Sequence, residues 1–134
     1  LYFDARRARP ELLFDPRKAI PRKSFALNDP TVREQWVRLL ERADSSPPQS
    51  LTLAIIEADS FCDDILKRIG LQGDTMADRL GALRAQELKS MQRLWRAHRV
   101  RNDLVHTPGF YLAPNEARSI LQDYIAFLVE IEAI

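Results

Sequence analysis

The stretch that decides the fold is SLTLAIIEADSFCDDILKRI, residues 50–69. Its apolar residues recur three and four positions apart, the spacing that places side chains on one face of an α-helix. The residues expected to face inward are Leu51, Ile55, Ala58, Cys62, Ile65, Leu66 and Ile69. Leu53, Ile56 and Phe61 widen this apolar face, so we expect the helix to be central in the fold. Gly70 then follows as a C-terminal cap.

A second helix is expected before this segment. Asp29 can cap it, Pro30 suits its first position, and the turn-forming residues 44–49 end it. Its apolar stripe comprises Val32, Trp36, Leu39, Leu40 and Ala43.

Three further helices are expected after Gly70. Asp74 can cap a short one, a longer one spans about residues 85–105, and the last begins at Pro114. The residues expected in their core are Met76, Leu80, Leu83, Leu88, Met91, Trp95, Leu104, Ala117, Ile120, Leu121, Tyr124, Leu128 and Ile131. No segment alternates as a strand does. The pattern therefore predicts an all-α bundle of four to five helices over residues 29–134.

Residues 1–28 differ in character from this bundle. Their prolines recur too often for a helix, because proline removes a backbone donor and restrains the residue before it. We expect an irregular, Pro-rich basic arm that contacts phosphates or an acidic surface, or that is only a solvated linker. Because the chain begins at Leu1, we expect a fragment, and a membrane tether upstream of it is one alternative.

Composition excludes several classes of protein. A chain of 134 residues, 46% of them hydrophobic and 29% charged, is typical of one globular domain. Cys62 is the only cysteine, so no intrachain disulfide or multi-cysteine zinc site can form. The four glycines form no nucleotide-binding motif, and the longest apolar run, residues 125–129, is too short to cross a membrane. We expect no cofactor, no metal, no membrane span within this chain, and a cytoplasmic location.

The net charge of +1 conceals two basic segments. Residues 1–23 carry seven Lys or Arg against three Asp or Glu, and residues 84–101 carry six against one. Within the second segment, Lys89, Arg93 and Arg96 lie on one side of the expected helix. Together with His98 they are the residues expected to contact a substrate such as an RNA backbone, the alternative being a solvated helical face.

The densest group of reactive side chains is HRVRNDLVH, residues 98–106, which holds both histidines of the chain. The two histidines are about 12 Å apart along a helix axis, too far for one metal ion. The arrangement Arg101-Asn102-x-x-x-His106, at the end of the third long helix, resembles the motif of HEPN domains. These domains are helical bundles in which an arginine, often followed by asparagine, precedes a histidine. The resemblance covers the helix order over residues 29–134.

The resemblance implies a metal-independent endoribonuclease of the toxin or defence type that acts as a homodimer, with two motifs facing one cleft. It makes His106 the general acid or base on the RNA 2′-hydroxyl or leaving oxygen. It also assigns Arg101 to the scissile phosphate and Asn102 to orienting His106 or the phosphate. Histidine titrates near neutrality and a guanidinium offers a fixed fork of donors, so these residue types suit the reaction. The implied partners are a second copy of the chain, RNA, and an antitoxin or another protein.

A structural interpretation stays open for the same residues. Arg101 can pair with Asp103 or with an acidic residue of the central helix, Glu57 or Asp59. His106 can simply cap the end of its helix, where a cation is favourable. HEPN-like bundles also include members without nuclease activity that serve as dimerisation or interaction modules, which is the second functional hypothesis.

Overall fold

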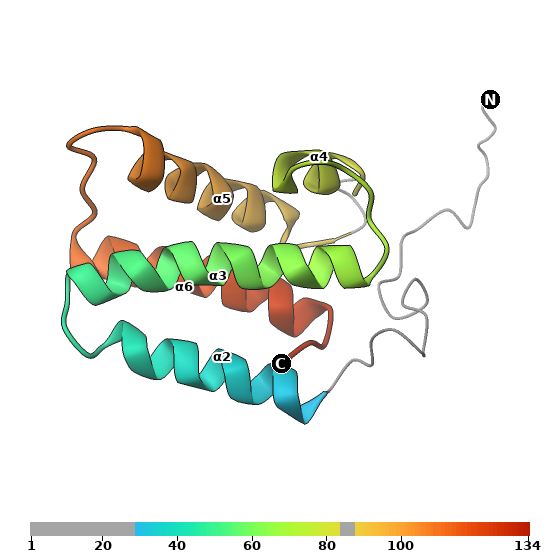
Figure 1. Cartoon of the computed structure of the whole chain (residues 1–134), viewed down its shortest axis with the longest axis horizontal. Helices are drawn as coiled ribbons and strands as arrows, with labels where there is room; N and C mark the ends of the chain where they lie inside the picture. The colour runs from blue at the N-terminus through green and yellow to red at the C-terminus, as the bar shows by residue number, and fades with distance from the viewer. Residues whose placement is uncertain (1–28, 84–87) are drawn as a thin grey trace.

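The computed structural model describes residues 29–83 and 88–134, and these residues form five helices and no strand. Labelled as in Figure 1, the helices are α2 (Pro30–Ala43), α3 (Gln49–Arg68), α4 (Met76–Gly81), α5 (Met91–His106) and α6 (Pro114–Glu130). The expected all-α bundle is therefore confirmed. The expected arm, residues 1–28, lies outside the described residues.

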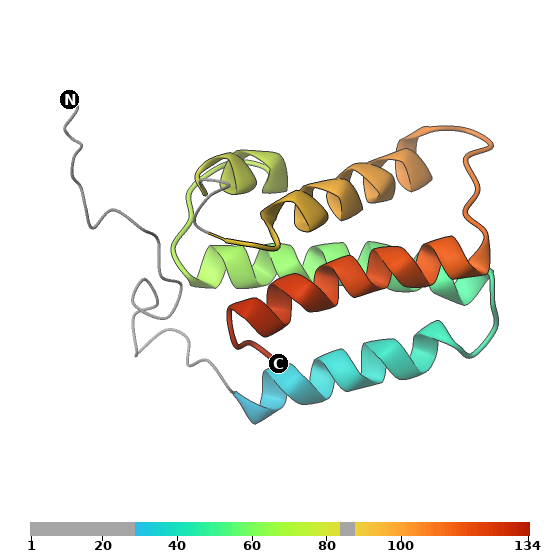
Figure 2. The same ribbon diagram turned by 180° about the vertical axis from the view of Figure 1, so that it is seen from behind.

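Helix α3 lies at the centre of the bundle and packs against each of the other four helices. Helix α6 runs beside it, α2 covers one flank, and α5 covers the other while also packing on α6 (Figure 1, Figure 2). The end of α5 and the beginnings of α3 and α6 lie at the same end of the molecule. The sequence motif thus ends at one end of the bundle.

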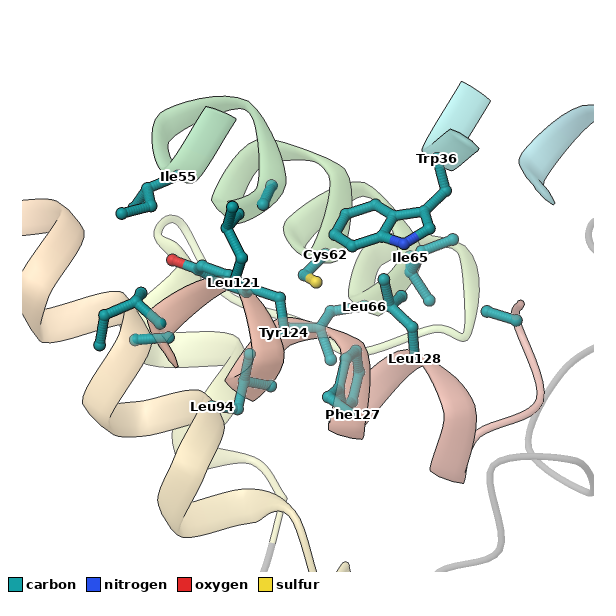
Figure 3. Close-up of a cluster of buried hydrophobic side chains, with 14 of the residues drawn as sticks. Trp36, Ile55, Cys62, Ile65, Leu66, Leu94, Leu121, Tyr124, Phe127 and Leu128 are labelled. Carbon is teal, nitrogen blue, oxygen red and sulfur yellow. The ribbon is translucent and has the colours of Figure 1, made fainter. Parts of the chain in front are cut away.

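The core gathers on the inward face of α3, as the spacing of its apolar residues predicts. All seven residues expected to face inward are at most 3% exposed. Figure 3 shows Cys62, Ile65 and Leu66 of this helix among side chains from α6, with Trp36 of α2 beside them. Complete burial of a large apolar side chain stabilises a fold by roughly 1.5–3 kcal/mol, so this cluster supplies most of the driving force.

The helix ends follow local rules that the sequence predicts. The Asp29 carboxylate accepts a hydrogen bond from the backbone of Thr31 at 2.9 Å, with Pro30 at the first position of α2. At the end of α3, Gly70 has a φ of +95°. Its N–H donates to the carbonyl of Lys67 and the next N–H donates to the carbonyl of Leu66, which is the Schellman arrangement.

Two helix beginnings differ from the prediction. The cap of α4 is Thr75 rather than Asp74, because the Thr75 hydroxyl accepts from the backbone of Asp78 at 3.1 Å. Helix α5 begins at Met91 and not near residue 85, and residues 84–87 of the expected helix lie outside the described residues. Of its expected core residues, Leu88 and Met91 are buried, whereas Trp95 and Leu104 are only partly buried. Leu94, Ala97 and His98 take the innermost positions.

The start of α5 is held by a side chain from the end of α6. The Glu130 carboxylate accepts hydrogen bonds from the backbone N–H groups of Lys89 and Ser90, both at 2.8 Å, and from the Ser90 hydroxyl at 2.6 Å. Partial burial opposes ionisation of Glu130, but these hydrogen bonds outweigh it and lower the pKa of its carboxyl group. Glu130 therefore supplies the N-terminal cap that α5 lacks in its own sequence.

We expect Glu130→Gln to lower the free energy of unfolding by about 1 kcal/mol at neutral pH, because an amide turns a donor towards a backbone N–H. A carboxyl group with a lowered pKa in the folded state stabilises the fold above its ordinary pKa. That contribution is lost as the pH falls through the lowered value. Urea unfolding at pH values from 7 downwards should therefore show the difference between the two proteins shrinking in acid. Glu41→Gln, on the exposed face of α2, is the control, and an equal effect there would contradict the assignment.

Candidate functional site

The motif lies on the second half of α5, and only part of it faces solvent. His98 is 6% exposed and points into the bundle, Arg101 and Asn102 are partly buried, and His106 is exposed as the last residue of the helix. The residues named from the sequence are thus spread from the core to the surface along two turns of helix.

The inner end of the motif meets a buried carboxylate on α3. Asp59 is 3% exposed, whereas Glu57 lies on the surface and pairs with Arg42 at 2.9 Å. The question that the sequence left open is therefore decided in favour of Asp59. The spacing carried a signal for this, because Asp59 stands four residues after Ile55 and three before Cys62, on the inward face.

Two other helices direct polar groups at this carboxylate. From α5, the Nδ1 atom of His98 lies 3.0 and 3.2 Å from the two oxygens of Asp59, and the Nε atom of Arg101 lies 3.5 Å from Oδ2. From α6, the Tyr124 hydroxyl donates to Oδ1 at 2.8 Å. Buried charge is costly unless it is paired and hydrogen-bonded, so these contacts make burial of Asp59 tolerable.

Asn102 connects the two α5 residues to each other. Its Oδ1 atom accepts from Nη1 of Arg101 at 2.9 Å, and its Nδ2 atom lies 3.4 Å from Nε2 of His98. Asp59, His98, Asn102 and Arg101 therefore close a ring of side chains, with Tyr124 attached to Asp59. We call these five residues the Asp59 cluster. The amide of Asn102 thus contacts Arg101 and His98 in this structure, and its expected role in orienting His106 or the phosphate stays a prediction.

The buried, low-dielectric environment of the Asp59 cluster keeps the Tyr124 phenol and the nearby Cys62 thiol protonated. Burial raises the pKa of the Tyr124 phenol far above its usual value, and the nearby Asp59 charge adds to the effect, so the phenol stays a donor. Burial, together with Asp59 and Asp63, raises the pKa of the Cys62 thiol well above its usual value. Cys62 is therefore a buried thiol that stays protonated, on the inward face where the sequence places it.

Arg101 bridges the cluster and the surface. Its side chain is 27% exposed, and its Nε atom is enclosed near Asp59 while Nη1 is engaged by Asn102. One turn further, His106 stands at the end of α5 beside exposed Val105, and the following loop exposes Phe110 and Tyr111. The arrangement holds a guanidinium beside Asp59 and Asn102 and, five residues later at the end of the same helix, presents a solvent-exposed imidazole.

The residues expected to contact a substrate occupy different environments. Arg93 and Arg96 each donate through Nε to Asp123, at 2.8 and 2.7 Å, and both side chains remain about half exposed although Asp123 is 1% exposed. Lys89 is exposed and near the start of α5. These three residues can meet a polyanion, whereas His98 is enclosed by the Asp59 cluster.

His98 and Tyr124 show what the sequence interpretation missed. His98 is expected from the sequence to contact a substrate, yet it follows Met91 and Leu94 at spacings of seven and four residues, which mark the core. Tyr124 was assigned to the core for its apolar spacing alone. A buried tyrosine usually places its hydroxyl on a polar partner, and that rule was the available signal.

Comparison with protein-family models, curated proteins and solved structures gives no match to this chain. Within residues 29–83 and 88–134, no three His, Cys, Asp or Glu side chains are grouped so that they could hold a metal ion. No helix in that part of the chain is long and apolar enough to cross a membrane.

We expect Tyr124→Phe to lower the free energy of unfolding by about 1–2 kcal/mol, because it removes a donor from a buried carboxylate. Tyr111→Phe removes a hydroxyl from a side chain that is 66% exposed, and it should change stability by less than about 0.5 kcal/mol. Urea unfolding of both variants provides the comparison. Equal effects of the two substitutions would contradict the role of Tyr124 in compensating Asp59.

Proposed function

We propose that this protein is a HEPN-like, metal-independent endoribonuclease that acts as a homodimer. The observation that carries the proposal is the pairing of Arg101, oriented by Asp59 and Asn102, with an exposed His106 five residues later at the end of the same helix. A fixed donor group and a titratable group at one solvent-exposed helix end are what cleavage of a phosphodiester requires.

In the proposed reaction, His106 takes the proton of an RNA 2′-hydroxyl. The 2′-oxygen then forms a bond to phosphorus and the bond from phosphorus to the 5′-oxygen breaks, giving a cyclic phosphate. The leaving oxygen takes a proton from the partner subunit's His106, so the dimer again holds one neutral and one protonated imidazole, with the roles of the two subunits exchanged. Arg101 stabilises the negative charge that develops on the phosphate oxygens. One histidine motif on each chain is the reason for expecting a dimer.

The charged face of α5 supports an RNA substrate. Arg93 and Arg96 share one buried carboxylate, so the pair keeps a net positive charge, and Lys89 adds another at the start of the helix. Such a row of cations suits phosphates spaced along a nucleic-acid backbone. As part of the same proposal, the enzyme is a cytoplasmic toxin or defence effector, with an antitoxin or another protein as its regulator.

A specific observation favours a second candidate, a non-catalytic HEPN-like dimerisation or interaction module. Arg101 already balances the charge of Asp59 inside the bundle, so its presence can be explained without a substrate. In that case the exposed Val105, Phe110 and Tyr111 near the end of α5 would serve a protein partner.

The test is cleavage of mixed structured and single-stranded RNA in the presence of EDTA. We expect the native protein to cleave, and His106→Ala and Arg101→Ala to lose about 10²–10⁴-fold in rate, because each removes a group that acts on the reacting phosphate. Arg99→Ala is the matched control, since Arg99 is an exposed cation on the same helix and outside the motif. It should cleave at close to the native rate.

Sedimentation of the same samples shows whether the protein is a folded dimer, and the cleavage result then decides between the two candidates. A folded native dimer that cleaves no RNA, or that cleaves equally with and without His106, would remove the ribonuclease proposal and leave the interaction module. Cleavage that requires His106 and persists in EDTA would exclude the hypothesis of a non-catalytic interaction module.

A further inference from the structure

We propose that His98 is a positioning residue: its neutral imidazole sets the direction of the Asn102 amide, and this amide in turn sets the guanidinium of Arg101. The inference rests on the proposed function for its activity readout, and a second readout needs no RNA. His98 is too deeply buried to meet a substrate, so any effect it has on activity must pass through other residues.

The orientation of the Asn102 amide follows from Arg101. A guanidinium can only donate hydrogen bonds, so the atom 2.9 Å from Nη1 of Arg101 must be the amide oxygen. The amide nitrogen then faces the Nε2 atom of His98 at 3.4 Å. Because an amide nitrogen only donates, Nε2 of His98 must offer a lone pair.

The protonation state of His98 follows from the other side of its ring. Nδ1 lies 3.0 Å from one oxygen of Asp59 and 3.2 Å from the other, and an ionised carboxylate only accepts. The single proton of a neutral ring must therefore reside on Nδ1, which leaves Nε2 bare as Asn102 requires. Both ends of the imidazole agree on one state, the neutral Nδ1–H tautomer.

A second proton on His98 would remove the acceptor that the Asn102 amide needs. Nε2–H would then face the amide NH2 of Asn102, and the amide could escape only by turning its NH2 towards Arg101, where two donors would again meet. The charged or titratable groups around His98 are Asp59 from α3, Tyr124 from α6 through its bond to Asp59, and Arg101 on its own helix. Neutral His98 is thus the state that holds Arg101 in place.

Two substitutions separate this role from a merely structural one. His98→Asn places an amide nitrogen near the position of Nδ1, so it keeps a donor for Asp59 but offers nothing to Asn102. His98→Gln reaches the position of Nε2, so it keeps an acceptor for Asn102 and loses the donor for Asp59. Each removes one hydrogen bond of the imidazole, which makes the pair a matched comparison.

If His98 positions Arg101, His98→Gln should cleave RNA within about threefold of the native rate, whereas His98→Asn should lose roughly ten- to a hundredfold. If His98 only compensates the charge of Asp59, His98→Asn should cleave RNA faster than His98→Gln. Activities that merely follow the thermal stability of the variants would also overturn the inference. Arg99→Ala is again the control, because it changes an exposed residue of the same helix and should leave the cleavage rate close to native.

Nitrogen NMR of the native protein without RNA is the second readout. We expect the His98 ring to be protonated at Nδ1 only, and the Arg101 guanidinium to rotate slowly in the native protein and in His98→Gln but freely in His98→Asn. An Nε2–H tautomer in the native protein overturns the inference even if His98→Asn fails to fold. If the native protein cleaves no RNA while the NMR pattern holds, the ribonuclease proposal fails and the positioning of Arg101 stands.

Discussion

The buried carboxylate of Asp59 is the constraint on which the centre of this molecule depends. A charge enclosed in the middle of α3 would cost several kcal/mol if its partners were missing. Those partners come from two other helices, His98 and Arg101 from α5 and Tyr124 from α6. Apolar packing alone would allow the helices to slide. The hydrogen bonds of His98 and Tyr124 to Asp59, with the ion-pair contact of Arg101, are satisfied together at one register only.

Further polar contacts apply the same principle along α5. Asp123 of α6 is almost fully buried and is held by Arg93 and Arg96, and Glu130 caps the start of α5 through the backbone at Ser90. Helix α5 is therefore fixed to α6 near its start and middle and to α3 through Asp59. Its last turn, which carries the exposed half of the motif, projects from a helix whose direction is already set. Such support is what orients a reactive side chain on a scaffold.

Arg101 has both a structural role, beside Asp59, and a proposed chemical role, on the scissile phosphate. Its inner atoms take part in balancing Asp59, and 27% of the side chain remains accessible. A guanidinium can do both, because its five donors point in different directions within one plane. His106, in contrast, has no place in the buried ring and owes its position to the end of the helix. Contacts with Asp59 and Asn102 thus fix the position of Arg101, whereas His106 lies in the last turn of the helix, where a cation is favourable and where its ring is open to solvent.

The sequence by itself determined the helices, their apolar faces and the position of Arg101 and His106 near one helix end, because these follow from local spacing and turn chemistry. Spacing alone already placed Asp59 and His98 on the inward faces of their helices, and only the tertiary structure decided that Asp59 meets His98 and Arg101. It also decided where α5 begins, since the cap comes from α6, forty residues away in the chain. Hydrophobic periodicity reports which face of a helix is inward, whereas pairing of polar groups depends on which helices meet and at what register.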